Sequence, residues 1–249
     1  MTRNPFLHHR VPFPDGDRLV LGLRQFDGAA DGRVLRPALD LVVIAARRGG
    51  QDVLSAEPTT LAAVLEAQAA ALGGQPFLRF EGRTLSFAEL DRCVNRTANG
   101  LARLGVAPGV GVAIMLPNSP EWLFSYFATQ KLGAYAVPVN VALKGEGLRH
   151  VLDHSDAVVL VTHPDYVGAV AALRPALAKL REIVVDTTDT TNTTDVPVDF
   201  LAPEGWRTLA ELMAAAVTSP GVEITPGGIS SLLYTSGTTG TPKAILHTH

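Results

Sequence analysis

From Thr59 onward the chain alternates short apolar runs with segments whose apolar residues recur at helical spacing, and this alternation constrains the fold most. Turn residues bound the short runs, so we interpret them as buried strands. They are GVGVAIMLP (109–117), AYAVPVN (134–140), AVVLVT (157–162), EIVVD (182–186) and ISSLLY (229–234). Strands that alternate with helices form βαβ units. The sequence therefore predicts an α/β fold, a doubly wound and mostly parallel sheet with flanking helices.

Capping residues mark where the helices begin. Ser86 and Glu89 have the spacing of a capping box, in which each side chain accepts a hydrogen bond from the other residue's backbone N–H, and Thr208 and Glu211 repeat it. Proline follows Ser119 at the first position of another helix. The expected helices are 59–72 with Leu61, Val64, Leu65 and Leu72 on one face, 86 to a stop at Gly105, 119 to a stop at Gly133, 145–154, 164–180 with an interruption near Pro175, and 208 to about 216.

The first 55 residues differ from the rest. They are rich in Arg, Pro, Gly and Asp, and their two apolar runs, 18–26 and 39–46, lack a regular pattern. Two interpretations remain open, an extension of the domain or a start codon assigned too far upstream. We therefore divide the chain into an irregular extension at 1–55 and a domain at 56–249, which opens with a helix and a short hairpin that turns at Glu81-Gly82.

Composition excludes several classes of protein. The formal net charge of −3 and the pI near 6.2 give no reason to expect nucleic acid or an anionic membrane as a partner. Cys93 is the only cysteine, so thiolates of this chain form neither an internal disulfide nor a zinc cluster. No run approaches the roughly 18 apolar residues of a membrane span, and the amino terminus lacks the apolar core of a signal peptide. We expect a cytoplasmic protein without a membrane span.

The segment that follows ISSLLY combines three devices that bind phosphate. Glycines allow positive φ and a close approach of backbone N–H groups to phosphate oxygens. Hydroxyl groups donate hydrogen bonds, and a lysine, one of only four in the chain, adds a point charge. Because ligands of doubly wound sheets bind beyond the carboxyl ends of strands, this loop lies where a ligand is expected. Its candidate binding residues are Thr235, Ser236, Gly237, Thr238, Thr239, Gly240 and Lys243.

The loop is not a Walker A motif, which requires G-x-x-x-x-G-K-[ST]. Counted from Gly237, Pro242 occupies the place of the second glycine. Ile245 and Leu246 also favour a strand after the loop, whereas a helix follows a Walker A loop.

The segment YTSGTTGTPK (234–243) closely resembles the signature of the adenylate-forming superfamily, which comprises acyl-CoA synthetases, luciferases and the adenylation domains of peptide synthetases. The resemblance extends back to about Thr59 and is densest over LSFAELDRCVNRTANGLARLGVAPGVGVAIMLPNSPEWLFSYFATQKLGAYAVPVN (85–140). Asn140 in VPVN is more similar to the acyl-CoA synthetase branch. Ala244 departs from the pattern, because the family usually has glycine there.

The resemblance implies a reaction in two steps. A carboxylate attacks the α-phosphate of ATP, bound with Mg²⁺, and forms an acyl-adenylate and pyrophosphate. A thiol, usually that of coenzyme A, then displaces AMP and forms a thioester. By matching positions, residues Thr235 to Gly240 and Lys243 would hold the β- and γ-phosphates and stabilise the charge of the leaving pyrophosphate.

The resemblance also implies elements with no counterpart before Ser231. The family has an acidic metal ligand, an aspartate for the ribose and a catalytic lysine in a mobile carboxy-terminal domain, all after this loop. We therefore assign no catalytic residue and no metal ligand, and we expect an amino-terminal fragment that is inactive alone. The alternative is a non-catalytic nucleotide-binding or scaffold module derived from such an enzyme. The acid substrate cannot be read from these residues.

His150-Val151-Leu152-Asp153-His154 is a near match to the H-x-x-E-H zinc motif. The two histidines share a helical face, but aspartate is shorter than the required glutamate, and the sequence supplies no third ligand. We expect a solvated polar face here.

Two further features are expected to be structural. Cys93 lies beside core positions without an activating partner, which favours a small buried residue over a nucleophile. An aromatic-rich helix is expected to pack against the sheet, and its aromatic residues are Trp122, Phe124, Tyr126 and Phe127.

Overall fold

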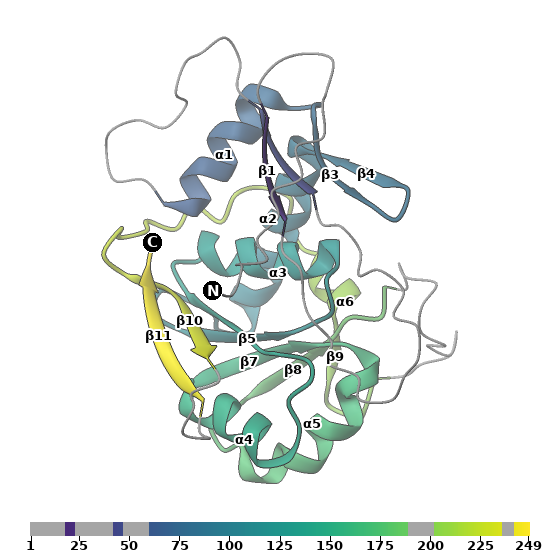
Figure 1. Ribbon diagram of the computed structural model, residues 1–249, viewed down its shortest axis with the longest axis vertical. Coiled ribbons are helices and arrows are strands. Elements are labelled where there is room, and N and C mark those ends of the chain that lie inside the picture. The colour runs from purple at the N-terminus through teal and green to yellow at the C-terminus, as the bar shows by residue number, and fades with distance from the viewer. Residues whose placement is uncertain (1–17, 23–41, 47–59, 189–201, 236–241) are drawn as a thin grey trace, which may run out of the picture.

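The computed structural model describes residues 18–22, 42–46, 60–188, 202–235 and 242–249. Within these ranges a seven-stranded sheet has the order β11-β10-β6-β5-β7-β8-β9, and a four-stranded sheet has the order β1-β2-β3-β4 (Figure 1). The strands are β1 (Arg18–Gly22), β2 (Val42–Ala46), β3 (Pro76–Phe80), β4 (Arg83–Ser86), β5 (Gly111–Met115), β6 (Tyr135–Pro138), β7 (Ala157–Thr162), β8 (Glu182–Val185), β9 (Arg207–Thr208), β10 (Ile229–Thr235) and β11 (Lys243–Thr248).

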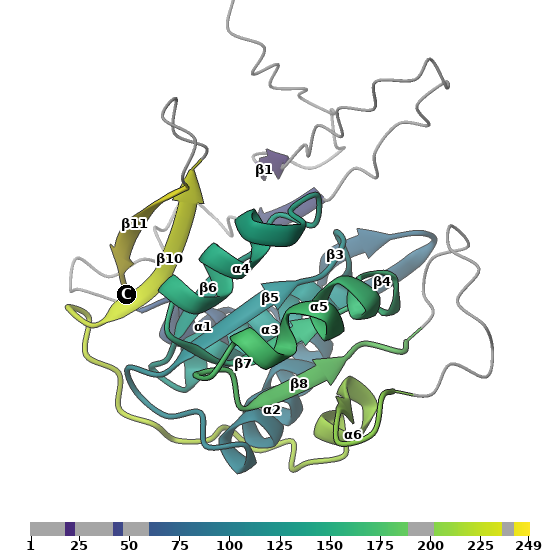
Figure 2. The same cartoon turned by 90° about the horizontal axis from the view of Figure 1, so that it is seen from below.

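Helices cover both faces of the larger sheet, as its alternating sequence predicts (Figures 1 and 2). On β5, Val112 and Ile114 join the core on the side of α2, α3 and α6, while Ala113 and Met115 join the core on the side of α4 and α5. A strand that is buried on both faces is typical of a parallel sheet. The helices are α1 (Leu61–Leu72), α2 (Phe87–Arg103), α3 (Pro120–Lys131), α4 (Gly145–His154), α5 (Val167–Leu173) between the short 3₁₀ turns Pro164–Tyr166 and Arg174–Ala176, and α6 (Leu209–Met213).

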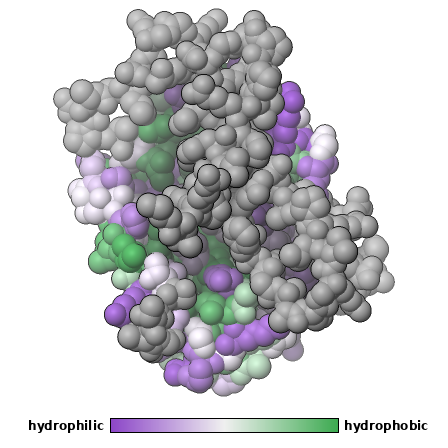
Figure 3. Space-filling model, viewed as in Figure 1, coloured by the Kyte–Doolittle hydropathy of each residue, from purple (hydrophilic) through white to green (hydrophobic). Residues whose placement is uncertain are grey.

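The larger sheet is parallel except at one edge, where β11 runs antiparallel to β10. This confirms the predicted fold class and the strand expected at Ile245 and Leu246. Strand β11 lies at the edge of the sheet and has a neighbouring strand on one side only. Its side chains Ile245 and Leu246 are 48% and 61% exposed. Figure 3 shows hydrophobic surface over β11.

Both predicted capping boxes are confirmed. At the start of α2, the backbone N–H of Glu89 donates to Ser86 Oγ over 3.2 Å, and the N–H of Ser86 donates to Glu89 Oε2 over 2.8 Å. The same pair of bonds joins Thr208 and Glu211 at α6. These reciprocal bonds satisfy N–H groups that have no partner inside a helix.

Gly100 shows how closely α2 and α6 pack. A Cβ atom at this position would lie 2.6 Å from the carbonyl oxygen of Leu212, which real side chains do not tolerate. The absence of a side chain therefore permits the contact. The predicted end of α6 near Ala216 is wrong, because the helix stops at Met213 and the chain then passes along α2, where Asn99 Nδ2 donates to the carbonyl of Ala216 over 2.9 Å.

On α1 the predicted apolar face is only partly confirmed. Leu65 is buried, but Leu61 is 40% exposed and Ala62 takes its place in the interior. Helix α1 packs against α2 and α3, and the side of the helix that faces them includes Ala62 and Leu65 but not its first residue. On α3, Phe124 is buried and Trp122, Tyr126 and Phe127 pack against the same core, as predicted. Cys93 is half-buried, and burial raises the pKa of its thiol.

The predicted hairpin belongs to the four-stranded sheet and not to the larger sheet. Its turn residues Glu81 and Gly82 have φ values of 47° and 77°, which suit a two-residue hairpin turn. Strand β2 pairs with β3 through two register pairs, Val42 with Arg79 and Val43 with Leu78. The two apolar runs of the first 55 residues therefore contain strands.

We propose that residues 56–249 form the folding unit and that residues 1–55 are an extension. Strand β2 does pair with β3, but through two register pairs, so removing residues 1–55 is expected to leave the thermal denaturation midpoint nearly unchanged. A control that removes only residues 1–17 retains β1 and β2. A large loss of thermal stability or solubility in the 56–249 chain, but not in the control, would show that β1 and β2 are part of the fold.

Candidate functional site

The two residues that bound the predicted phosphate-binding loop, Thr235 and Lys243, lie at the carboxyl edge of the larger sheet. Strand β10 ends at Thr235, and β11 begins at Lys243, its partner in the antiparallel register. Strand β10 is parallel to β6, which is parallel to β5, so the carboxyl ends of all three strands meet at this edge. The loop is therefore held at its base by a closed hairpin, where ligands of such sheets bind.

Of the predicted binding residues, the structure describes the two that bound the loop. Thr235 and Lys243 are both exposed, and no acid in the described ranges forms an ion pair with the Lys243 ammonium. A lysine without a carboxylate partner keeps its charge available for an anion. The other predicted residues, Ser236, Gly237, Thr238, Thr239 and Gly240, lie outside the described residues.

The opposite end of the hairpin is tied to the fold. Ser230 Oγ donates to the carbonyl oxygens of His247 and Thr248 over 3.2 and 2.9 Å, which links the two strands. Gln130 Nε2, at the end of α3, donates to the carbonyl oxygen of Ser230 over 3.0 Å. These bonds between buried or half-buried groups fix the hairpin against α3.

Two histidines of α4 face the base of the loop, and sequence reasoning missed this contact. His154 Nδ1 lies 2.8 Å from the hydroxyl oxygen of Tyr234, and His150 Nε2 lies 3.3 Å from the carbonyl oxygen of Pro242. His154 is exposed and His150 half-buried, as a solvated polar face would have them, but tertiary packing also gives both histidines partners from a segment about 80 to 90 residues later. Within the described part of the chain, no group of three or more His, Cys, Asp or Glu side chains is arranged to hold a metal ion.

Buried acids lie at the same edge beyond β5 and β8. Glu121 is 3% exposed and Asp186 is 4% exposed. Burial, and then the nearby Asp186 carboxylate, raise the pKa of Glu121 to about 7. Burial also raises the pKa of Asp186. Among the described residues, neither Glu121 Oε2 nor the buried hydroxyl of Thr162 on β7 has a hydrogen-bond partner.

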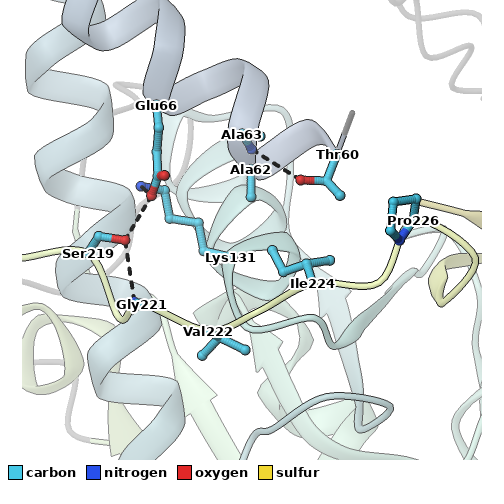
Figure 4. A pocket seen from close by; sticks show the side chains of 10 residues that line it. All are labelled: Thr60, Ala62, Ala63, Glu66, Lys131, Ser219, Gly221, Val222, Ile224 and Pro226. Carbon is cyan, nitrogen blue, oxygen red and sulfur yellow. Dashed lines mark hydrogen bonds and ion pairs between the residues drawn. The ribbon is translucent and has the colours of Figure 1, made fainter. Parts of the chain in front are cut away.

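A cavity of about 330 Å³ lies at the opposite, amino end of β10 (Figure 4). Beside it the ammonium of Lys131 donates to Glu66 Oε1, Asp91 Oδ1 and Asn95 Oδ1 over 2.8, 2.7 and 2.7 Å. All three donors of the lysine are used, which leaves none for a ligand. The cavity is lined by Thr60, Ala62, Ala63, Glu66, Lys131, Ser219, Gly221, Val222, Ile224 and Pro226.

Glu66 connects this lysine to the segment before β10. Its Oε1 atom also accepts a hydrogen bond of 2.8 Å from Ser219 Oγ. Burial raises the pKa of Glu66, while the bonds from Lys131 and Ser219 together lower it by more, so the net pKa is lowered. The network of Lys131, Glu66, Asp91 and Asn95 joins α1, α2 and α3 and serves packing, not ligand binding.

Comparison with known proteins places most of the chain in one family. Residues 65–249 match the family model described as AMP-binding enzyme. The chain is 33% identical over 220 residues to the medium/long-chain-fatty-acid–CoA ligase FadD6 of Mycobacterium tuberculosis, which covers 87% of this chain and 34% of that protein. It is 37% identical over 172 residues to the feruloyl-CoA synthase of an Amycolatopsis species, covering 69% of this chain and 30% of that protein.

The crystal structure of the anthranilate CoA ligase AuaEII in complex with anthranoyl-AMP has the same fold over the matched part. The TM-score is 0.69 at 29% identity, and the match covers 77% of this chain and 35% of that chain. The chain thus spans about a third of the length of the relatives it matches. Since the family model covers well over half of the chain, and the loop lies at the edge of the sheet where such a fold binds ligands, the chain belongs to the family of AMP-binding enzymes.

Proposed function

We propose that this chain supplies the phosphate-binding part of an AMP-forming acid–thiol ligase. The observation that carries this proposal is the closed hairpin of β10 and β11, which places exposed Thr235 beside exposed Lys243 at the carboxyl edge of the sheet. Hydroxyl and ammonium donors at this edge suit the oxygens of a polyphosphate. The relatives named as CoA ligases support the same kind of reaction.

The proposed reaction starts with ATP and a carboxylic acid. A carboxylate oxygen forms a bond to the α-phosphorus, and the bond from that phosphorus to the oxygen bridging to the β-phosphate breaks. Pyrophosphate leaves with the electron pair of that bond. The thiolate sulfur of coenzyme A then bonds to the acyl carbon. The bond between the acyl carbon and the phosphate oxygen of AMP breaks, and AMP leaves with its electron pair.

The residues of this chain act in the first of these steps. Lys243, the hydroxyl of Thr235 and the residues from Ser236 to Gly240 would hold the β- and γ-phosphates, where negative charge grows as the bond breaks. Donors that are already positioned stabilise this charge without reorganisation. Because ATP and coenzyme A are cytoplasmic cosubstrates, we place the reaction in the cytoplasm.

Among the described residues, no cluster of three or more His, Cys, Asp or Glu side chains is arranged to hold a metal ion. We therefore assign no ligand to Mg²⁺ and derive no step through it. The carboxylic acid is also not assigned, because the relatives act on acids as different as fatty acids and ferulate by their names. The described ranges contain no helix with the length and apolar character of a transmembrane span.

Replacing Lys243 by Ala tests the proposal in the protein at the full length of its relatives. Loss of one charged contact costs on the order of 1.5–3 kcal/mol in the transition state, which corresponds to roughly a ten- to hundredfold loss of kcat for adenylate formation. Thioester formation from supplied acyl-adenylate begins after pyrophosphate has left, so this step is expected to stay near wild type. ATP–pyrophosphate exchange and single-turnover thioester formation measure the two steps.

Lys144→Ala is the matched control, because Lys144 is also exposed and its side chain makes no capping bond at the start of α4. This variant is expected to leave both half-reactions unchanged. If Lys243→Ala slowed thioester formation as much as adenylation, the phosphate-holding role would be wrong. If the wild-type protein gave no exchange with fatty or aromatic acids, the ligase proposal itself would fail in favour of a non-catalytic nucleotide-binding module.

A further inference from the structure

We propose that His150 and His154 of α4 are positioning residues that hold the two ends of the phosphate-binding loop, Pro242 and Tyr234, in place for adenylation. The inference rests on the proposed function for its kinetic consequence, but the contacts are independent of it. His154 lies against the residue that precedes Thr235, and His150 lies against the residue that precedes Lys243. One helix therefore contacts both ends of the same loop.

The contact between His154 and Tyr234 is a short hydrogen bond of 2.8 Å. Burial, followed by the neighbouring Tyr135 and Asp156, raises the pKa of Tyr234 to about 12. The phenol consequently keeps its proton at physiological pH and is able either to donate to Nδ1 or to accept from an Nδ1–H group.

The contact of His150 has a defined direction. Its Nε2 atom lies 3.3 Å from the carbonyl oxygen of Pro242, and a carbonyl oxygen only accepts hydrogen bonds. Nε2 must therefore carry the proton and donate it. Because proline has no N–H group, this carbonyl is the single backbone hydrogen-bonding group of Pro242, so the histidine engages the only polar backbone atom that the residue offers.

Ring contacts add to these two hydrogen bonds. The rings of His150 and His154 lie 5.2 Å apart, as expected for positions one turn apart on a helix. The Tyr234 ring stands nearly perpendicular to both histidines, with centroid distances of 6.4 Å to His150 and 5.9 Å to His154. Edge-to-face arrangements of this kind are favourable. The three rings form one cluster between α4 and β10.

Helix α4 is anchored in the core, whereas β11 lies at the edge of the sheet. Leu148, Val151 and Leu152 of α4 are buried in the core on this side of the sheet. By contrast β11 is an edge strand that pairs with β10 alone. Besides the histidines, the ends of the loop are held by the hydrogen bonds of the hairpin and by the packing of Tyr234 and Ala244 against the core. A displacement of about 1 Å in a binding group is enough to reduce catalysis strongly.

A metal site is the competing interpretation of the histidine pair. The two nitrogen atoms that face β10 and Pro242 are already in contact with protein oxygens, and the described residues bring no third ligating side chain to them. The contacts with Pro242 and Tyr234 therefore explain the positions of both histidine side chains without a metal ion. The near match to a zinc motif follows from the spacing of the two histidines, which is one helical turn.

A double-mutant cycle in the full-length protein tests the contact of His154. His154→Ala and Tyr234→Phe are each expected to lower kcat for ATP–pyrophosphate exchange roughly five- to tenfold, as the loss of one hydrogen bond allows. The double variant is expected to be no slower than the slower single variant, because both changes remove the same bond. Thioester formation from supplied acyl-adenylate is expected to remain at the wild-type rate.

Conservative variants separate positioning from a general effect on folding. His154→Asn retains an acceptor near the place of Nδ1, and His150→Gln retains an N–H donor near the place of Nε2, so both are expected to recover most of the activity that the Ala variants lose. Arg149→Ala is the control on the same helix, since its guanidinium pairs with Glu146 at the exposed surface. It is expected to behave as wild type.

Amide hydrogen exchange gives a readout that does not depend on activity. In the His150→Ala and His154→Ala variants, peptides covering 234–243 are expected to exchange faster, while peptides of α4 and β5 keep their wild-type protection. Additive effects in the cycle, equal losses in both half-reactions, or unchanged exchange at 234–243 would each overturn the inference. If the wild-type protein were inactive but exchange changed as expected, the ligase proposal alone would fail.

Discussion

Replacing Lys131 by Met is expected to lower the free energy of unfolding by about 3 kcal/mol, because it leaves the carboxylates of Glu66 and Asp91 without their shared cation. The Lys131 side chain is 1% exposed, so its ammonium depends on these three bonds in place of hydration. The carboxylates are 44% and 21% exposed and regain part of their hydration, which sets the loss at the low end of the range for broken buried pairs. Urea denaturation monitored by circular dichroism measures the change.

The same substitution at Lys179 is the matched control. Lys179 forms an ion pair of 2.6 Å with Asp156, but its side chain is 53% exposed. Exposed pairs contribute little, so Lys179→Met is expected to cost less than about 1 kcal/mol. Combining Lys131→Met with Glu66→Gln and Asp91→Asn removes the unpaired charges and is expected to restore part of the stability. Equal losses at Lys131 and Lys179 would contradict a special role for the buried network.

The pH dependence of stability is expected to change at Glu121. Its pKa is about 7 in the fold against an ordinary value of 4.5, so the folded state holds a proton that the unfolded chain releases between these values. The contribution of this group is therefore fully favourable below pH 4.5 and is lost as the pH rises through about 7. A shift of this size corresponds to roughly 3 kcal/mol at most.

Glu121→Gln removes the ionisation while retaining the shape of the side chain. The variant is expected to be more stable than wild type at pH 8, by up to roughly 3 kcal/mol, and to differ little from it at pH 4.5. Denaturant titrations at several pH values measure the difference between the two proteins. Glu204→Gln, which changes an exposed glutamate, is the control and is expected to show no such trend. A constant difference across this pH range would show that Glu121 does not ionise in the fold.

Local sequence was sufficient to predict most of the secondary structure. The capping boxes at Ser86 and Thr208 mark helix starts because their hydrogen bonds span only three residues. The strand at Ala157–Thr162 and the helix at Gly145–His154 have the bounds that their patterns predict. The antiparallel direction of β11, and the second sheet that contains the hairpin, were not predicted, because strand pairing depends on how distant segments pack.

For the candidate site, the sequence by itself predicted the chemistry of the loop and its place after a buried strand. Glycines, hydroxyl residues and Lys243 after a buried strand predict phosphate binding at the carboxyl edge of a parallel sheet. The two histidines that contact Pro242 and Tyr234 could not be found in this way. His150 and Pro242 are 92 residues apart, and His154 and Tyr234 are 80 residues apart.

The same division applies to the core. Sequence periodicity determined which helix faces and strands are apolar, because burial of apolar side chains follows from local spacing. Only the tertiary structure decided that Lys131 is buried with Glu66 and Asp91, which lie 65 and 40 residues away. A charged side chain enters the interior only where carboxylates from other elements compensate the loss of hydration, and that arrangement exists only once α1, α2 and α3 have packed together.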